Sequence, residues 1–211
     1  MSIRTNYENW YSGEEYYWGL EPASFLDELI KMCPPSEDKK VLDIGCGEGK
    51  DAVYMAQKGY DVTAFDLAEN GIRKTLMLAK EKDVRIHAFV DDINTFNIES
   101  GFDMIYSTGT IQYLAEDNKS AFFEKIKRLT KLNGVVFFNV FVEKPFLELP
   151  PDWDMEEKMW KSGELFTYLP EWKIERIDET IFEDRSGDIP HFHCMDILVC
   201  RKVLQVPESF Q

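Results

Sequence analysis

The sequence predicts an α/β fold in which helices cover both faces of a mostly parallel sheet of seven strands. Short β-branched or aromatic runs alternate with stretches of helical spacing, and this alternation is typical of β–α–β units. Five such units fit into about 100 residues. Two further strands near the end of the sequence are separated by a short turn that contains glycine, so we expect a C-terminal antiparallel hairpin.

The first predicted strand, residues 40–44, leads into the glycine-rich turn 45–49. A helix over residues 51–58 comes next, and Gly59 stands just after its end, where glycine is favoured. The later elements follow in the same alternation: strand 61–65, helix 69–82, strand 85–90, strand 102–106, helix 119–132 and strand 135–140.

The two ends of the sequence lie outside this alternation. Residues 7–20 are dense in Tyr and Trp and have no strand partner, while residues 21–32 predict a helix with Pro22 in its first turn. We expect both segments to cap the edge of the sheet. The C-terminal region contains a Pro- and Trp-rich connection at 143–160, a strand near 172–182, a turn at 185–188 and a final strand over 191–201.

Charge and cysteine content exclude several function classes. Asp and Glu number 39 against 24 Lys and Arg, and the formal net charge of -15 repels phosphate backbones and anionic lipids. We therefore expect no nucleic-acid partner and no membrane partner. The 4 cysteines form no CxxC pair, which favours a reducing compartment, the cytoplasm. Without an apolar leader or an apolar stretch of about 18 residues, we expect neither export nor a membrane span.

The glycine-rich turn predicts a ligand-binding crevice. Glycines let the backbone approach a ligand closely, and Asp66 ends the next strand 21 positions after Gly45. A carboxylate at that place can bridge two ribose hydroxyls. A tight strand-to-helix turn without a ligand is the alternative, and the spacing to Asp66 argues against it.

The residues around the turn favour a cationic ligand over a dinucleotide. Lys50 stands where the dinucleotide fingerprint has its third glycine. Asp43, Glu48 and Asp51 place negative charge where a pyrophosphate would sit. S-adenosylmethionine (SAM) carries a sulfonium and an ammonium and no phosphate, so Coulomb attraction favours it over NAD. We expect Asp43 to meet the methionine end of SAM, with turn capping as the alternative.

The segment VLDIGCGEG at 41–49, with Asp66, resembles the first two motifs of class I SAM-dependent methyltransferases. Residues 90–93 resemble the third motif, in which an Asp meets the adenine amino group, and this role falls to Asp92 with Asp91 as the alternate. Residues 102–107 resemble the fourth motif. The resemblance implies a Rossmann-like, doubly wound, three-layer α/β/α fold and an enzyme that converts SAM to S-adenosylhomocysteine (SAH).

The ends of the chain narrow the resemblance further. Tyr7, Trp10, Tyr11 and Trp18, together with the hairpin segment 191–196, are most similar to the small tellurite-resistance (TehB-type) methyltransferases. This similarity implies a small-molecule acceptor with a soft nucleophilic atom, such as a thiol or a metalloid oxyanion. The sequence departs from the pattern at 183–185, where the family has a His-Arg pair.

These arguments define one set of expected site residues. For the cofactor they are Tyr11, Trp18, Asp43, Gly45, Cys46, Gly47, Asp66, Leu67, Asp91, Asp92, Ile93, Ser107, Thr108 and Gly109. For the acceptor pocket they are Gln112 and Tyr113, which the resemblance places after the fourth motif. We expect a single domain over 1–211, divided into a cap (1–35), a cofactor-binding core (36–142) and an acceptor-side connection with the hairpin (143–211).

Several of these residues have a second interpretation. Tyr11 and Trp18 either face the sulfonium or only pack the cap. Cys46 fills a position that requires a small side chain, and we do not expect it to act as a nucleophile, because methyl transfer is a direct displacement.

His191 and His193 share one strand face, so that either could accept a proton from the acceptor, or both are polar residues on the hairpin rim. Arg185 either attracts an anionic acceptor or solvates the turn. Two histidines without a third ligand nearby in sequence do not make a metal site, so we expect none.

Two competing functions remain open from the sequence. One is a SAM-sensing module that regulates a partner without turnover. The other is an NAD-dependent oxidoreductase, which Lys50 and the acidic turn disfavour. The sequence is compatible with a monomer or a homodimer.

Overall fold

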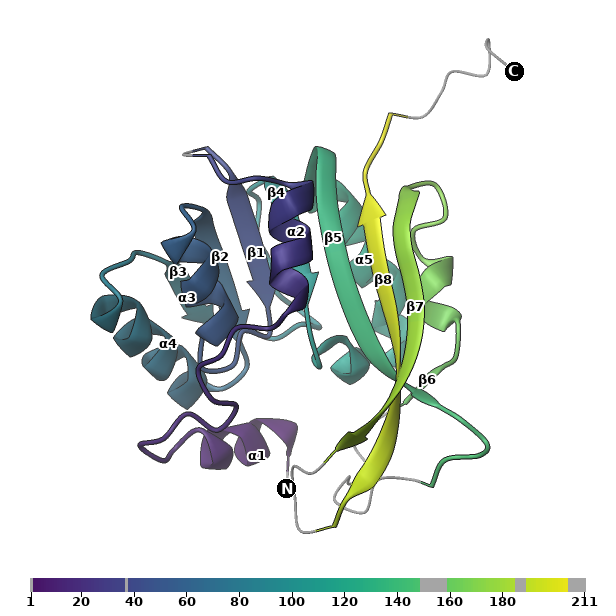
Figure 1. The fold of residues 1–211 in the computed structure, drawn as a ribbon, viewed down its shortest axis with the longest axis horizontal. Helices are drawn as coiled ribbons and strands as arrows, with labels where there is room; N and C mark the ends of the chain where they lie inside the picture. The colour runs from purple at the N-terminus through teal and green to yellow at the C-terminus, as the bar shows by residue number, and fades with distance from the viewer. Residues whose placement is uncertain (1, 37, 149–158, 185–188, 205–211) are drawn as a thin grey trace.

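The computed structural model describes residues 2–36, 38–148, 159–184 and 189–204. Its centre is a single twisted sheet (Figure 1). The strands lie side by side in the order β3 (His87–Val90), β2 (Asp61–Asp66), β1 (Lys40–Ile44), β4 (Phe102–Ser107), β5 (Thr130–Glu143), β8 (His191–Arg201) and β7 (Lys173–Asp184). The two-residue strand β6 (Trp160–Lys161) pairs with the end of β5 and adds one strand to the seven that the sequence predicts.

The first five strands are parallel, and β8 runs antiparallel to both β5 and β7. From β1 the chain builds outward to β2 and β3 on one side and to β4 and β5 on the other. The carboxyl ends of β1 and β4 are therefore the topological switch point, where open α/β sheets bind ligands. We refer to the loops that follow β1 to β4 at this end of the sheet as the walls of the predicted crevice.

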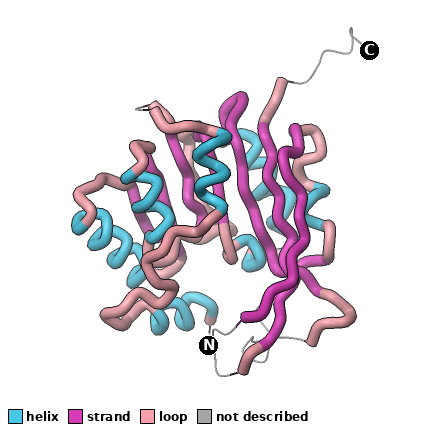
Figure 2. The backbone as a smooth tube through the Cα atoms, in the orientation of Figure 1, coloured by secondary structure: helices cyan, strands magenta, loops and turns pink. Residues whose placement is uncertain are grey.

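Helices cover both faces of the sheet, as Figure 2 shows. One face carries α2 (Phe25–Met32), α3 (Lys50–Gln57) and α4 (Glu69–Glu81), and the other carries α5 (Lys119–Leu129). The central strands are buried on both faces: Val41 packs into one hydrophobic cluster and its neighbour Leu42 into the other. This explains why apolar residues stand side by side in these strands, as in Val41-Leu42 and in residues 135–138, instead of alternating with polar ones.

The structure corrects the prediction for the helix after residue 21. The helix begins at Phe25, with Ser24 at its N-cap, so Pro22 lies before the helix and not in its first turn. The helix also packs on the face of the sheet instead of capping its edge. Leu26 and Leu29 are fully buried, and the Phe25 ring stacks on Phe137 with 3.9 Å between centroids.

Other boundaries differ by a few residues. Strand β3 begins at His87, two residues later than expected, and α5 ends at Leu129, three residues earlier. Helix α5 stops there because Thr130 already pairs with Phe102 as the first residue of β5. The predicted turn at 185–188 lies outside the described residues. Among the described residues, no helix has the length and apolarity needed to cross a bilayer.

The N-terminal segment forms a helix that the sequence did not predict, α1 (Ile3–Trp10), below the carboxyl ends of the strands in Figure 1. Glu8 of this helix caps α4. Its carboxylate accepts hydrogen bonds from the backbone N–H of Glu69 (2.6 Å) and of Asn70 (3.0 Å). Ala68, the N-cap residue of α4, has no side chain that can do this. The carboxylate also lies at the positive end of the α4 dipole.

Replacing Glu8 should therefore loosen both helices. We expect Glu8→Ala to lower the free energy of unfolding by about 0.5–2 kcal/mol, the usual cost of losing a helix cap. Hydrogen exchange at the backbone of residues 3–11 should become faster in the same variant. Glu14→Ala, which changes an exposed acidic side chain in the same segment, is the control and should leave both quantities unchanged. Equal exchange in the two variants would contradict the capping role.

Candidate functional site

The turn between β1 and α3 has a backbone that only glycine adopts easily. Gly45, Gly47 and Gly49 have φ values of 76°, 55° and 87°, all in the left-handed region. Neighbouring side chains also leave no room for a Cβ atom. At Gly45 it would lie 2.0 Å from Oγ1 of Thr110, and at Gly49 it would lie 2.6 Å from the Thr75 side chain. Sterics therefore require glycine at these two positions even without a ligand.

Asp66 joins this glycine loop to the start of α4. One carboxylate oxygen accepts from the backbone N–H of Gly47 at 2.8 Å, and the other accepts from Ala68 at 2.9 Å. The loop is also held to β2 by the N–H of Cys46, which donates to the carbonyl oxygen of Phe65 at 3.0 Å. Burial raises the pKa of Asp66 above its ordinary value. Asp66, the predicted ribose-binding residue, thus borders the glycine loop and fixes the position of this loop relative to the start of α4.

Asp43 lies deeper, on β1, and only 3% of it is exposed. The Tyr106 hydroxyl donates to its Oδ2 at 3.0 Å, and burial raises the pKa of this carboxyl well above its ordinary value. The next strand is fixed beside it, because Oγ of Ser107 donates to the carbonyl oxygen of Ile44 at 2.8 Å. This hydrogen bond therefore joins the carboxyl ends of β1 and β4 at the switch point.

The other two acidic residues near the loop have protein partners. The ammonium of Lys74 lies 2.7 Å from Oε1 of Glu48, and their side chains are 4% and 3% exposed. Asp51 accepts from the backbone N–H of Ala23 at 2.8 Å. From the sequence, both residues were expected to offer negative charge to a ligand. In the structure Glu48 is paired with a cation and Asp51 accepts a backbone hydrogen bond, so both have partners within the protein.

The aromatic N-terminal segment lies directly on the glycine loop. Tyr11 is buried, and its hydroxyl oxygen lies 3.0 Å from the place where a Cβ of Gly47 would be. Nε1 of Trp18 donates to the same hydroxyl at 3.1 Å. Lys74, on α4, holds the segment in place by donating to the backbone carbonyl of Glu15 at 2.5 Å. Burial, with Asp66 as the next cause, raises the pKa of Tyr11.

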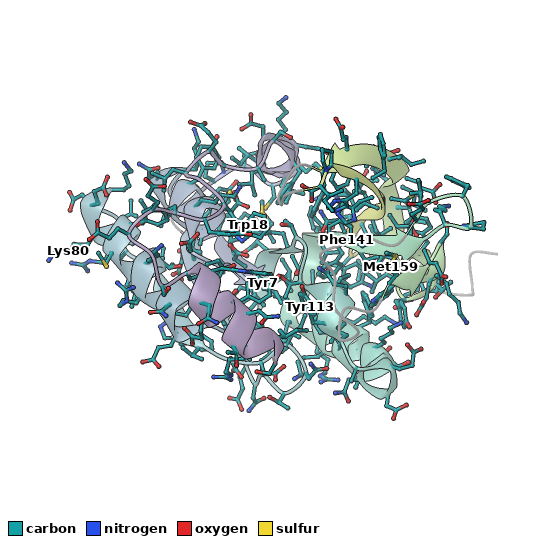
Figure 3. The ribbon with its side chains drawn as sticks, turned by 90° about the horizontal axis from the view of Figure 1, so that it is seen from below. Tyr7, Trp18, Lys80, Tyr113, Phe141 and Met159 are labelled. Atoms are coloured by element: carbon teal, nitrogen blue, oxygen red, sulfur yellow. The ribbon has the colours of Figure 1, made fainter. Side chains whose placement is uncertain are left out.

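The same segment reaches across to the predicted acceptor side. The hydroxyl groups of Tyr7 and Tyr113 lie 2.9 Å apart. Figure 3, which views the molecule from the carboxyl ends of the parallel strands, shows Tyr7, Trp18 and Tyr113 grouped on this face, with Phe141 toward the hairpin. The cap thus spans the crevice from the glycine loop to the residues after β4.

The predicted adenine-binding turn is held by one asparagine. The N–H of Asn94 donates to Oδ1 of Asp92 at 2.8 Å, so the Asp92 carboxylate stabilises the turn in which it lies. The N–H of Asp92 in turn donates to Oδ1 of Asp91 at 2.8 Å. Nδ2 of Asn94 donates to the carbonyl oxygen of Tyr113 at 3.2 Å. Ile93 is buried beneath them. Each carboxylate therefore has one oxygen committed to the turn itself.

The loop after β4 completes the crevice. The N–H of Gly109 donates to Oδ1 of Asn139, on β5, at 2.9 Å, and Nε2 of Gln112 donates to the carbonyl oxygen of Gly109 at 2.7 Å. Gln112 is 3% exposed, and its Oε1 has no hydrogen-bond partner among the described residues. A buried acceptor of this kind is costly unless a ligand or water donates to it.

The structure brings the predicted cofactor residues together at the carboxyl ends of β1 to β4. Leu67 and Thr108 lie on the crevice loops with the residues described above. Cys46 is 9% exposed, and burial raises the pKa of its thiol, so the reactive thiolate is disfavoured. His191 and His193 lie apart from this group on the hairpin, and Arg185 falls outside the described residues.

Four residues that hold the crevice were not predicted: Glu8, Lys74, Asn94 and Asn139. Each acts through a hydrogen bond or an ion pair to a residue distant in sequence. Hydrophobic periodicity carries no signal for such pairs. Only a polar residue at an otherwise buried position, such as Lys74 on α4, would have suggested one.

The sequence of the chain was compared with known families and curated proteins. A sequence model of the family described as tellurite resistance protein TehB matches residues 8–189. The chain belongs to this family. Among curated proteins, "Probable S-adenosyl-L-methionine-dependent methyltransferase TehB" of Haemophilus influenzae is 30% identical over 142 residues, which cover 60% of this chain and 50% of that protein. The chain thus spans about half the length of the curated TehB relatives it matches.

Solved structures agree with the fold. TehB from Haemophilus influenzae superposes with a TM-score of 0.78 at 24% identity, covering 93% of this chain and 67% of that one. The magnesium protoporphyrin IX methyltransferase ChlM from Synechocystis, solved with bound SAH, has a TM-score of 0.66 at 17% identity over 85% of this chain and 80% of that one. The predicted Rossmann-like α/β fold is therefore confirmed.

The close approach of α4 to the glycine loop gives a testable prediction. A Cβ at Gly71 would lie 2.7 Å from the carbonyl oxygen of Gly47 and 3.0 Å from the Tyr11 ring. Alanine in a helix interior is normally better than glycine by about 0.8–1 kcal/mol. Here we expect the opposite, with Gly71→Ala lowering the free energy of unfolding by about 1–3 kcal/mol, measured by urea denaturation.

Gly13→Ala is the matched control, because an added Cβ there meets nothing within 4 Å. It should change the free energy of unfolding by no more than about 0.5 kcal/mol. A Gly71→Ala protein that is as stable as the parent would show that the loop and α4 can separate without cost.

Proposed function

We propose that this protein is a SAM-dependent methyltransferase that transfers a methyl group to a small-molecule acceptor and releases SAH. The observation that carries the proposal is the pair of carboxylates, Asp43 and Asp66, bordering a left-handed glycine loop at the switch point of the sheet. Membership of the TehB family supports it, as do curated relatives named as SAM-dependent methyltransferases.

The donor and acceptor groups of the crevice fit SAM. Asp43 suits the cationic methionine end, Asp66 suits the ribose hydroxyls, and the turn at Asp91 and Asp92 suits the adenine amino group. None of these acceptors would stabilise a pyrophosphate. The buried Oε1 of Gln112 is one more acceptor without a protein donor among the described residues.

The residues of the chain act by binding, orienting and excluding water. When bound, SAM supplies an activated methyl group, so the protein has no covalent intermediate to form. Its main contribution is to hold the acceptor atom in line with the departing thioether. Tyr11 and Trp18 cover the glycine loop and limit the access of water, which strengthens electrostatic interactions inside the crevice.

A cavity of about 220 Å³ is our candidate for the acceptor site. It lies between the end of β5 and the start of β8, and Phe141, Leu147, Met159 and His193 line it. Phe141 is two residues beyond Asn139, whose side chain holds the crevice loop at Gly109. Two residues of a strand span about 6.6 Å, so the cavity begins close to the crevice. Its size suits a small molecule.

We further propose that the accepting atom is soft, as in a thiol or a metalloid oxyanion. The family description names tellurite resistance, which supports a metalloid substrate. A soft nucleophile needs no strong general base, so transfer to such an atom would not require His193, which lines the cavity, to accept a proton. An oxygen or nitrogen acceptor would instead need a proton acceptor such as His191 or His193.

Calorimetric titration with SAM, SAH and NADH tests the cofactor. We expect the protein to bind the two adenosyl ligands and not NADH. Asp66→Asn should weaken SAM binding by about 10–100-fold, because a hydrogen bond to a charged group contributes about 1.5–3 kcal/mol. Asp61→Asn, at the exposed opposite end of the same strand, is the control and should bind like the parent. Binding of NADH alone would overturn the proposal.

An acceptor screen tests the second part separately. Release of SAH is measured with thiols, tellurite and selenite, and with phenol and amine compounds as hard-atom controls. We expect turnover with at least one soft acceptor and none with the hard ones. Turnover confined to hydroxyl or amine compounds would overturn the soft-acceptor proposal while leaving the methyltransferase proposal intact.

A further inference from the structure

Three potential metal ligands meet on the β7–β8 hairpin. Asp184 pairs directly with His191 across the two strands, and Phe182 pairs with His193. Residues two apart on a strand share a face, and directly opposed residues share the same face of the sheet. Asp184, His191 and His193 therefore project from one side of the hairpin, although Asp184 precedes the turn and the histidines follow it.

Two of the three distances between their side-chain atoms match those between ligands of one metal ion. Nε2 of His191 lies 2.9 Å from Nε2 of His193, which lies 3.3 Å from Oδ2 of Asp184, and the three ligand atoms are all within 4.8 Å of one another. Two ligands at about 2.1 Å from one ion are about 3.0 Å apart at a right angle and about 3.4 Å apart at the tetrahedral angle.

The outer hydrogen bond of His191 supports the same interpretation. Its Nδ1 lies 2.9 Å from the carbonyl oxygen of Ile189. A carbonyl oxygen only accepts, so Nδ1 carries the proton and Nε2 keeps its lone pair, facing the other two ligands. Metal-binding histidines typically donate their second ring N–H to a carbonyl or carboxylate in this way.

The cluster has the surroundings of a metal site with one open coordination position. His193 is 3% exposed, with the rings of Phe141 and Phe182 at centroid distances of 4.8 and 5.7 Å. The same histidine lines the cavity of about 220 Å³ described above. Three protein ligands beside a cavity leave a coordination position for an exogenous molecule, as in catalytic zinc sites.

We propose that Asp184, His191 and His193 bind a divalent transition-metal ion, with Zn²⁺ as the best match. Two imidazoles and one carboxylate suit Zn²⁺ and its first-row neighbours, whereas Ca²⁺ and Mg²⁺ prefer oxygen ligands alone. From the sequence alone no metal site is expected here, because no third ligand is evident near the two histidines. Asp184 supplies that ligand. Metal binding at this cluster does not depend on the proposed methyl transfer.

Titration of the chelator-treated full chain with Zn²⁺ tests the proposal. We expect one equivalent to bind, and Co²⁺ in its place should give the visible absorption bands of a low-coordinate site. His191→Ala and Asp184→Asn change partly exposed side chains, and circular dichroism will verify that both variants are folded. Each variant should weaken Zn²⁺ binding by at least about 10–100-fold, which is the usual effect of removing a residue that hydrogen-bonds to a metal ligand.

His87→Gln is the matched control, because His87 is the remaining one of the 3 histidines and lies on β3, at the opposite edge of the sheet. It should bind Zn²⁺ like the parent. Absence of Zn²⁺ binding by the parent would overturn the proposal. Binding of equal affinity in the parent, His191→Ala and Asp184→Asn would do the same, because the ion would then lie elsewhere.

Discussion

The steric fit of the glycine loop is the constraint on which the rest of the structure depends. Between β1 and α3 the backbone passes so close to the loop after β4, to α4 and to the N-terminal segment that a side chain at Gly45 or Gly49 would overlap its neighbours. Gly71 on α4 makes the matching close approach from the other side. The loop thus fixes the separation of the elements that form the crevice, and the hydrogen bond that Gly47 donates to Asp66 then fixes the orientation of the loop.

Charge has two separate roles around this loop. The buried pair of Lys74 and Glu48 holds the cap, the loop and α4 together and is neutral as a unit. Asp43 and Asp66 form no ion pair with another of the described residues, and burial raises the pKa of both. Their charge is therefore the more costly to bury, and a cationic ligand would offset that cost. The acidic surplus of the whole chain says less about the ligand than these two residues do.

Much of the fold was predictable because hydrophobic spacing is a local signal. Strand β1, helix α4 and strand β8 begin at the expected residues, and the ends of β1 and β8 also agree. The place of α2 was not predictable, because an amphipathic helix shows which of its faces is buried but not which sheet surface receives it. Helix α1 buries no residue fully and is held by polar contacts, so it leaves no apolar stripe in the sequence.

The candidate site could be predicted from the sequence only where its residues lie close together along the chain. Asp66 and the glycines follow from fixed spacing within one β–α–β unit, whereas Asn139 and Glu8 act on partners far along the chain. Asp184 shows the limit most clearly. Its relation to the two histidines exists only once the register of the hairpin is set, because a shift of one residue would place it on the other face.

The cap has a kinetic consequence. Tyr11 covers Gly47, and Tyr7 contacts Tyr113 on the opposite side of the crevice, so the segment spans the place where a ligand would enter. A ligand that reaches the glycine loop has to wait for these contacts to break, and one that is bound has to wait for them to break again before it leaves. We therefore expect changes in the first 20 residues that weaken these contacts to speed both the entry and the release of a ligand, so that residence time can change while affinity stays the same.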